Sequence, residues 1–239
     1  MAQVREIFGK ASKALGVPVL TPEYELVLAL VDSPDLTAEQ LFERSTLSRA
    51  GFFNTVERLK TWGIIVANSD VADRRRRIYR LQGDLRQIIF YRFSKYRVDY
   101  LDRDACTEPF VTRDLTARRD KGLDYFTCEF KILFYLYLRP EMPNFALRAL
   151  IDTSESKFHL SLRSLLENGL VTATAGSADR RLKQYAIGCH ARTAIQTLHS
   201  DLFGWLDTCE LIIHPLSHSP VPQATTSEQA SSQTSHCRV

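Results

Sequence analysis

The feature that most constrains the fold of this chain is an internal repeat with a period of 106 residues. Residues 21–81 align with residues 127–187 without a gap, and 15 of the 61 positions are identical. Unrelated sequences would share roughly three or four residues over such a length. Solenoid repeats have periods of about 20 to 50 residues, so a period this long indicates two copies of one domain in a single chain.

The size and composition of the chain agree with two small globular domains. The chain has 239 residues, 44% of them apolar and 25% charged, with a formal net charge of +3. These are ordinary values for a soluble globular protein. No apolar run approaches the roughly 20 residues that cross a bilayer, and the N-terminus lacks the apolar stretch of a signal peptide. We therefore expect a cytoplasmic protein without membrane contact.

Motifs of metal binding and catalysis are missing from the sequence. The five cysteines form no Cys-x-x-Cys pair and stand apart from the six histidines, which predicts neither a zinc site nor a disulfide framework. There is no phosphate-binding loop, no Gly-x-Ser-x-Gly and no His-Glu-x-x-His. We therefore expect no enzymatic activity, no metal and no cofactor. Cys106 and Cys128 flank the start of the second copy, and oxidant sensing by these thiols stays an alternative.

The first copy of the repeat begins with three predicted helices. Thr21 is a typical cap for the first helix, which ends near Ser33. Residues 37–40 read Thr-Ala-Glu-Gln, a capping box that begins a short second helix. Ser48 caps the third helix after a short turn. Two helices joined by so short a turn are typical of a helix-turn-helix, whose second helix can enter a DNA major groove.

A predicted β-hairpin follows the third helix. Gly63 stops that helix, residues 64–67 form a β-branched strand, and residues 77–81 alternate as the returning strand. The residues at 68–70, Asn-Ser-Asp, are typical of a turn. The hairpin is therefore a two-stranded wing with a basic tip.

The second copy predicts the same elements in the same order. Its short helix is placed at 143–151, its recognition helix at 154–168, and its wing strands at 170–175 and 182–187. The predicted fold is therefore mainly α with small β wings, made of two tandem winged helix-turn-helix domains.

Each wing is followed by a predicted long helix, at 84–101 and at 191–213. These helices are not needed for DNA contact, and we expect them to associate the two copies. The final stretch has no apolar periodicity and is predicted to be disordered. The predicted divisions are a first winged-helix domain at 1–101, a linker at 102–126, a second winged-helix domain at 127–214 and a tail at 215–239.

The first wing resembles that of the MarR family of bacterial transcription regulators. The family pattern is Asp-x-Arg, a few variable residues, then Leu-Thr; this chain has Asp-Arg-Arg at 73–75 and Leu-Gln at 81–82. The second wing keeps Asp-Arg-Arg at 179–181 and lacks Leu-Thr. The resemblance implies that Arg75 and Arg181 enter the minor groove, each oriented by an aspartate, Asp73 or Asp179.

The resemblance also implies how the two copies cooperate. Ordinary family members are shorter chains that act as homodimers, so this chain would be a monomeric pseudo-dimer, or two chains would pair. Family members often bind small aromatic ligands between the winged helices and the association helices. The aromatic residues at 126–137 therefore have two interpretations: they bind a small aromatic effector, or they pack in the core between the two copies.

Basic and polar residues of the recognition helices and wings are the candidate DNA contacts. Residues 74–103 contain ten Arg or Lys and three Asp, a local net charge of +7, which suits phosphates and a narrow minor groove. In the first copy the candidates are Ser48, Arg49, Phe53, Asn54, Arg58, Asp73, Arg74, Arg75, Arg76 and Arg77. In the second copy they are Ser154, Lys157, His159, Asp179, Arg180, Arg181 and Lys183.

The two recognition helices differ at the positions that reach base edges. Arg suits guanine and Asn suits adenine, and the first copy has Arg49 and Asn54. The second copy has Glu155 and Leu160 at these positions. We therefore expect unequal half-sites. Phe53 suits a thymine methyl group, with packing as the alternative.

These features favour a bacterial, sequence-specific, DNA-binding transcription regulator, a repressor, whose partner is double-stranded DNA. Two alternatives stay open. A plasmid replication initiator with tandem winged helices would bind directly repeated elements. A winged-helix protein-interaction scaffold would hold other proteins, but such scaffolds tend to be acidic.

Overall fold

The computed structural model describes residues 4–69, 73, 76–101, 124–139, 141–175 and 183–213. The predicted disordered tail and most of the predicted linker lie outside these residues. The described part is mainly helical with two small antiparallel sheets, which confirms the predicted fold class at that level. Within it, no helix combines the length and the apolar character that a membrane crossing requires.

The first copy of the repeat folds into three helices and a three-stranded sheet. Its elements are α2 (Pro22–Asp32), β1 (Leu36–Thr37), α3 (Ala38–Glu43), α4 (Arg49–Thr61), β2 (Ile65–Ser69) and β3 (Arg77–Leu81). The strand order is β1-β3-β2, with both pairs antiparallel. The side chains of Thr21, Thr37 and Ser48 cap the three helices as predicted. Local signals therefore decide where these helices begin.

The second copy has the same kinds of element in the same order. They are α7 (Cys128–Leu138), β4 (Met142–Pro143), α8 (Asn144–Leu150), α9 (Glu155–Glu167), β5 (Val171–Ala175) and β6 (Lys183–Ile187), with the strand order β4-β6-β5. Thr127 and Ser154 cap α7 and α9 with their side chains. The backbone turns left-handed just after both α4 and α9, at Gly63 and Gly169, a conformation that favours glycine.

One predicted turn is wrong. Asn68 and Ser69 extend β2 and pair with Ile78 and Arg77 of β3. The Arg77 guanidinium also donates to the Ser69 hydroxyl at 3.3 Å. The longer ladder gives the backbone groups of both strands partners that a turn at this point would not supply. The register set by β3 therefore outweighs the turn preference of Asn and Ser.

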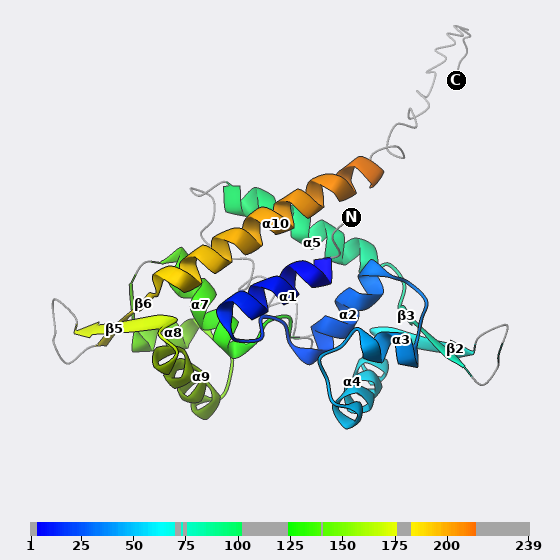
Figure 1. The fold of residues 1–239 in the computed structure, drawn as a ribbon, viewed down its shortest axis with the longest axis horizontal. Coiled ribbons are helices and arrows are strands. Elements are labelled where there is room, and N and C mark those ends of the chain that lie inside the picture. The colour runs from blue at the N-terminus through cyan, green and yellow to red at the C-terminus, as the bar shows by residue number, and fades with distance from the viewer. Residues whose placement is uncertain are drawn as a thin grey trace, which may run out of the picture.

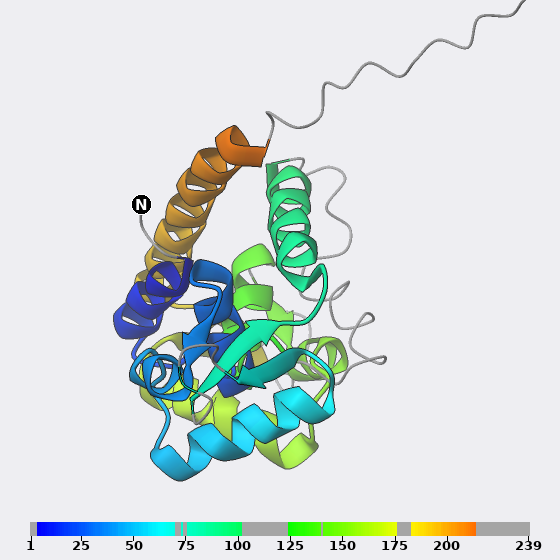
Figure 2. The same ribbon diagram turned by 90° about the vertical axis from the view of Figure 1, so that its right-hand side faces the viewer.

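The two predicted long helices are present as α5 (Leu85–Leu101) and α10 (Cys189–Ile213). They rise above the rest of the molecule in Figures 1 and 2. Phe90 and Phe93 of α5 meet Trp205 of α10, with ring centroids 5.1 and 6.0 Å apart. These contacts join the helices that follow the two wings, and the buried residues of both copies form one continuous core.

An additional helix, α1 (Val4–Leu15), was not predicted from the sequence. Its apolar face is buried, and α1 runs beside α10 in both ribbon views (Figures 1 and 2). Asp32, at the end of α2, accepts from the first two described amides of α1, those of Val4 and Arg5, at 3.0 and 3.2 Å. At the other end of α1, His190 Nε2 lies 2.8 Å from the carbonyl oxygen of Ala14. Helix α1 therefore ties the start of the first copy to the last helix.

The two copies meet at a short antiparallel bridge between Leu20 and Phe126. These residues are 106 positions apart, so they occupy the same place in the repeat. The amide of Thr21 donates to the carbonyl of Tyr125, and the amide of Thr127 donates to the carbonyl of Val19. Both hydrogen bonds are 3.0 Å long. Antiparallel pairing of equivalent residues is the contact that a two-fold axis produces between identical partners.

Figure 1 shows the consequence for the arrangement of the elements. Helices α4 and α9 lie on the same face, opposite α5 and α10, and the hairpins β2–β3 and β5–β6 project at opposite ends. The predicted recognition helices thus share one surface, flanked by the two wings.

Candidate nucleic-acid interface

The first helix-turn-helix is fixed in place by aromatic packing and by one carboxylate. Phe42 of α3 and Phe52 of α4 meet edge to face, with ring centroids 5.4 Å apart. Between the helices, the Glu25 carboxylate accepts from the amide of Thr46 at 3.1 Å and from its hydroxyl at 2.8 Å. Burial raises the pKa of Glu25. Helix α2 therefore holds the turn that sets the direction of α4, a role not predicted for Glu25.

The exposed half of α4 carries three of the predicted DNA contacts. Arg49, Phe53 and Asn54 are all exposed. The side chain of Phe53 touches the Phe52 ring, at 5.3 Å between centroids, yet it remains 46% exposed. Packing within the protein therefore leaves much of the Phe53 side chain accessible. Ser48 is also exposed, and its hydroxyl accepts from the amide of Gly51 and caps the helix.

Arg58, also a predicted contact, is engaged within the protein. Its Nη2 lies 2.6 Å from a carboxylate oxygen of Glu23 in α2, and it donates to the Thr55 hydroxyl at 3.3 Å. The Arg58 side chain is 53% exposed. Arg58 therefore lies at the edge of the exposed face of α4, and its guanidinium is bound by Glu23 of α2.

The structure describes part of the first wing. Arg76 and Arg77 are exposed at the start of β3, and Asp73 is exposed where the hairpin approaches its tip. Arg80 forms an ion pair with Asp35, whose backbone is left-handed with φ 70°. This pair fastens the wing to the loop before β1. Arg74 and Arg75 lie outside the described residues.

The second recognition helix presents a different set of side chains. The Ser154 hydroxyl caps α9 by accepting from the amide of Lys157, and the Lys157 side chain is exposed. His159 Nε2 lies 3.7 Å from a carboxylate oxygen of Glu155, one helical turn away. Leu160 is 65% exposed. The exposed half of α9 therefore carries an acidic residue, Glu155, at the position where α4 has Arg49, and it exposes Leu160 where α4 exposes Asn54.

The second wing and turn also differ from the first. Lys183 is exposed at the start of β6, while Asp179, Arg180 and Arg181 lie outside the described residues. The turn before α9 is held by Arg148, whose guanidinium donates to two carbonyl oxygens of the turn, both at 2.7 Å. No sequence motif singled out Arg148, because this contact depends on the folded turn.

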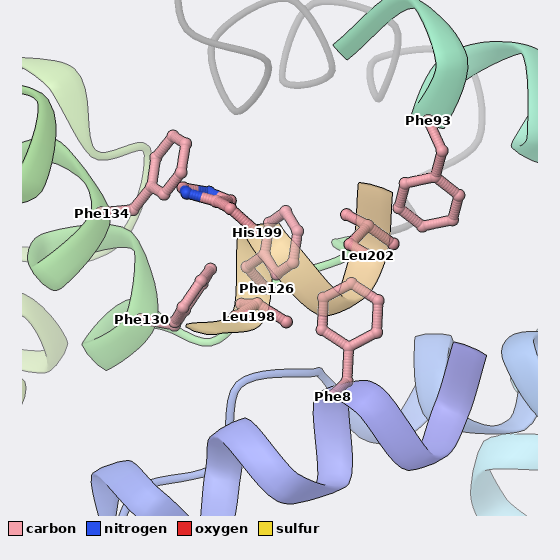
Figure 3. Close-up of a pocket in the computed structure, with 8 residues that line it drawn as sticks. All are labelled: Phe8, Phe93, Phe126, Phe130, Phe134, Leu198, His199 and Leu202. Carbon is pink, nitrogen blue, oxygen red and sulfur yellow. The ribbon is translucent and has the colours of Figure 1, made fainter. Parts of the chain in front are cut away.

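A narrow apolar cavity lies between α1, α5, α7 and α10 (Figure 3). It is lined by Phe8, Phe93, Phe126, Phe130, Phe134, Leu198, His199 and Leu202. The space open to the centre of a water molecule is about 20 Å³, which is sufficient for one water and far smaller than an aromatic ring. The predicted aromatic residues are thus used mainly as core in this conformation.

His199 is the one titratable side chain among the residues that line this cavity. The rings of Phe134, Tyr137 and Phe203 surround it, at 5.9, 5.4 and 6.0 Å between centroids. Burial lowers the pKa of His199 to about 4. The imidazole is therefore neutral at physiological pH.

The structure describes one of the two cysteines that were considered for oxidant sensing. Cys128 is buried, and burial raises the pKa of its thiol, which lowers the fraction of reactive thiolate. Cys106, the other cysteine considered for oxidant sensing, lies outside the described residues. In the described ranges no three His, Cys, Asp or Glu side chains are grouped to hold a metal ion.

No protein-family model and no curated protein matches this chain. Solved structures that match part of this chain include the transcriptional regulator Tm0710 from Thermotoga maritima, 19% identical over 54% of this chain and 77% of that one, with a TM-score of 0.37. Another is reduced AbfR bound to DNA, 16% identical over 56% of this chain and 90% of that one, with a TM-score of 0.30.

Proposed function

We propose that this chain is a sequence-specific DNA-binding transcription regulator, a repressor, in which two winged helix-turn-helix domains of one polypeptide act as a pseudo-dimer. Helices α4 and α9 enter successive major grooves, about one helical turn of DNA apart, as in dimeric helix-turn-helix proteins. The arginine-rich tips of the wings reach the flanking minor grooves. Arg75 and Arg181 are the residues assigned to this contact.

The bridge between Leu20 and Phe126 is the observation that carries the proposal. The antiparallel pairing of these two repeat counterparts is the contact that an approximate two-fold axis between the copies would produce. Both candidate recognition helices lie on one face of the molecule (Figure 1). A DNA site read about such an axis has inverted halves, because operator symmetry mirrors protein symmetry. This favours an inverted site over the directly repeated elements that a replication initiator would bind.

The exposed side chains of α4 and α9 support unequal halves. Arg49 and Asn54 suit guanine and adenine in the first half, whereas Leu160 in the second half cannot form a hydrogen bond with a base edge. Glu155 repels phosphate unless it accepts from a cytosine amine. The site is therefore an imperfect palindrome with a strong and a weak half.

An aromatic effector would act through the cavity around His199. The cavity lies where α1, α5, α7 and α10 meet (Figure 3), so a ligand there would alter how the long helices set the spacing of the two recognition helices. Its small volume requires the surrounding rings to move apart before an aromatic molecule enters. An effector therefore couples to DNA binding by widening this junction.

Selection of the full chain on a random duplex pool at near-physiological salt tests the proposal. The selected duplexes are sequenced and the mass of the complex is measured. An enriched motif with two inverted, unequal halves about 10 base pairs apart, bound by one chain, supports the pseudo-dimer. Directly repeated halves favour the replication initiator. Salt-sensitive binding without an enriched motif contradicts both and leaves the scaffold.

A further inference from the structure

We propose that Glu23 and Glu129 are positioning residues that fix the rotation of the two recognition helices and thereby set base selectivity. The inference rests on the DNA-reading function proposed above. The two glutamates occupy the same place in the repeat and are identical in both copies. Each lies in the first turn of the helix that precedes the helix-turn-helix.

In the first copy the glutamate acts through an arginine. Glu23 has a side chain only 14% exposed, and it binds Arg58 of α4 at 2.6 Å. Arg58 in turn donates to the hydroxyl of Thr55, which is 2% exposed. A carboxylate on α2 is therefore connected, through Arg58, to the buried hydroxyl of Thr55 in α4.

In the second copy the glutamate acts directly. Glu129 accepts from the Ser161 hydroxyl at 2.6 Å. Ser161, which is 3% exposed, is the repeat counterpart of Thr55. The counterpart of Arg58 is Ser164, so no cation stands between the carboxylate and the helix. The two copies thus reach the same point of the recognition helix by different chemistry.

These contacts constrain rotation because apolar packing alone is not directional. The stripe of Phe52, Val56 and Leu59 buries one side of α4, but small rotations of the helix preserve most of that burial. A short hydrogen bond to a carboxylate has a narrow optimum in distance and angle. Rotating α4 or α9 would break it, and would also move the base-reading side chains sideways in the groove.

The difference between the two copies gives the inference a readout that a general loss of stability would not produce. In Glu23→Gln, the ion pair is lost and Arg58, already half exposed, becomes available to a phosphate. Base discrimination in the first half-site should fall about three- to tenfold, as expected for coupled neighbours, and the salt slope should steepen by about one phosphate contact. In Glu129→Gln, discrimination should fall in the second half-site with an unchanged salt slope, because Ser161 carries no charge.

The experiment uses the full chain and the duplex selected by the wild type, together with duplexes altered in one half only. Competition binding measures discrimination in each half, titration at several salt concentrations gives the slope, and thermal melting checks folding. Glu57→Gln is the matched control for Glu23→Gln. It removes an α4 carboxylate that pairs with Lys60 at 2.9 Å and is 67% exposed, so it frees a cation without touching α2. Glu167→Gln, exposed at the end of α9, is the control for Glu129→Gln.

Arg58→Met approaches the first contact from the other side and keeps the test valid if Glu23→Gln folds poorly. Glu23 acts through Arg58, so the two substitutions should not add. The double variant Glu23→Gln/Arg58→Met should discriminate between bases no worse than whichever single variant discriminates less. Wild-type discrimination in Glu23→Gln and Arg58→Met, on a duplex that the wild type clearly selects, would overturn the positioning role alone. Failure of the wild type to select any duplex would instead overturn the proposed function.

Discussion

The hydroxyl of Thr127 lies 2.5 Å from the carbonyl oxygen of Pro18, in the other copy of the repeat. Thr21, its repeat counterpart, donates in the same way to the carbonyl of Asp124. Each hydroxyl oxygen also accepts from an amide of its own helix and so caps α2 or α7. The same two side chains therefore begin a helix and join the two copies.

Replacing Thr127 by Ala should destabilise the whole chain more than the loss of an ordinary helix cap. The cap contributes about 1 kcal/mol and the hydrogen bond to Pro18 about 1 kcal/mol more, so the free energy of unfolding should fall by about 2 kcal/mol. Urea unfolding of the full chain, followed by circular dichroism, measures this change. Thr127→Ser keeps the hydroxyl and should behave like the wild type.

Thr37→Ala is the matched control for that prediction. Thr37 caps α3 in a reciprocal capping box with Gln40, and none of these hydrogen bonds crosses to the other copy. Its loss should lower the free energy of unfolding by about 1 kcal/mol. If Thr127→Ala is no more costly than Thr37→Ala, the bond between the copies contributes nothing to stability.

The buried imidazole of His199 should make the fold sensitive to mild acid. Because the folded-state pKa is about 4 and the usual value is 6.5, the unfolded chain binds a proton first as the pH falls. The contribution of His199 to the free energy of unfolding is fully present above pH 6.5 and should decrease by up to about 3 kcal/mol as the pH approaches 4. His199→Leu should abolish that part of the pH dependence.

The difference between the wild-type and His199→Leu unfolding curves isolates this effect. Glu25 and Asp32 have raised pKa values because of burial, so their protonation favours the folded state over a neighbouring pH range and opposes the loss. His159 is exposed on α9, so His159→Gln is the matched substitution of a histidine outside the core. An equal slope in the wild type and in His199→Leu would show that His199 is not its source.

Exchanging the residues at one repeat position should exchange the base preferences of the half-sites. Asn54→Leu should remove a preference for adenine in the strong half, and Leu160→Asn should create one in the weak half, each amounting to about 1–3 kcal/mol of discrimination. Both positions are exposed, so stability should change by less than about 0.5 kcal/mol. Selection on random duplexes by each variant is the measurement. Unaltered motifs would mean that these side chains do not face the bases.

The wing arginines assigned from the sequence should contribute unequally. Arg75→Ala should weaken binding to the selected duplex by about 1–3 kcal/mol and reduce the salt slope. Arg181→Ala should cost less, because the second half of the site is the weaker one. Binding titrations at several salt concentrations compare the two variants. Equal losses would argue that the half-sites are equivalent.

Much of the fold could be predicted because its signals are local. A cap such as Ser48 and its amide partner Gly51 are three residues apart, so the sequence itself displays the pair. The strand at 77–81 was predicted with its observed bounds because alternation with period two is also visible locally. Because the two copies align without a gap, the elements predicted for the first copy also predicted those of the second.

The interactions that escaped prediction join residues far apart in sequence. Glu23 and Arg58, or Glu129 and Ser161, come together only once the helices pack. For the same reason Arg58 was assigned to DNA without its internal partner. Helix α1 has apolar residues at helical spacing, but its partner α10 lies at the other end of the chain. The sequence shows which chemical group each side chain carries. Which residue that group contacts depends on the tertiary fold.

The packing of α1 against α10 also has a consequence for how the protein is made. The ribosome synthesises α1 before α10, so the buried face of α1, which consists of Val4, Ile7, Phe8, Ala11 and Leu15, meets this part of its packing surface only after α10 has been made. Domains usually fold in order as they emerge. Here the apolar face of α1 stays partly uncovered until α10 has been made, so a nascent chain that lacks α10 exposes an apolar surface that quality-control proteases and chaperones can recognise.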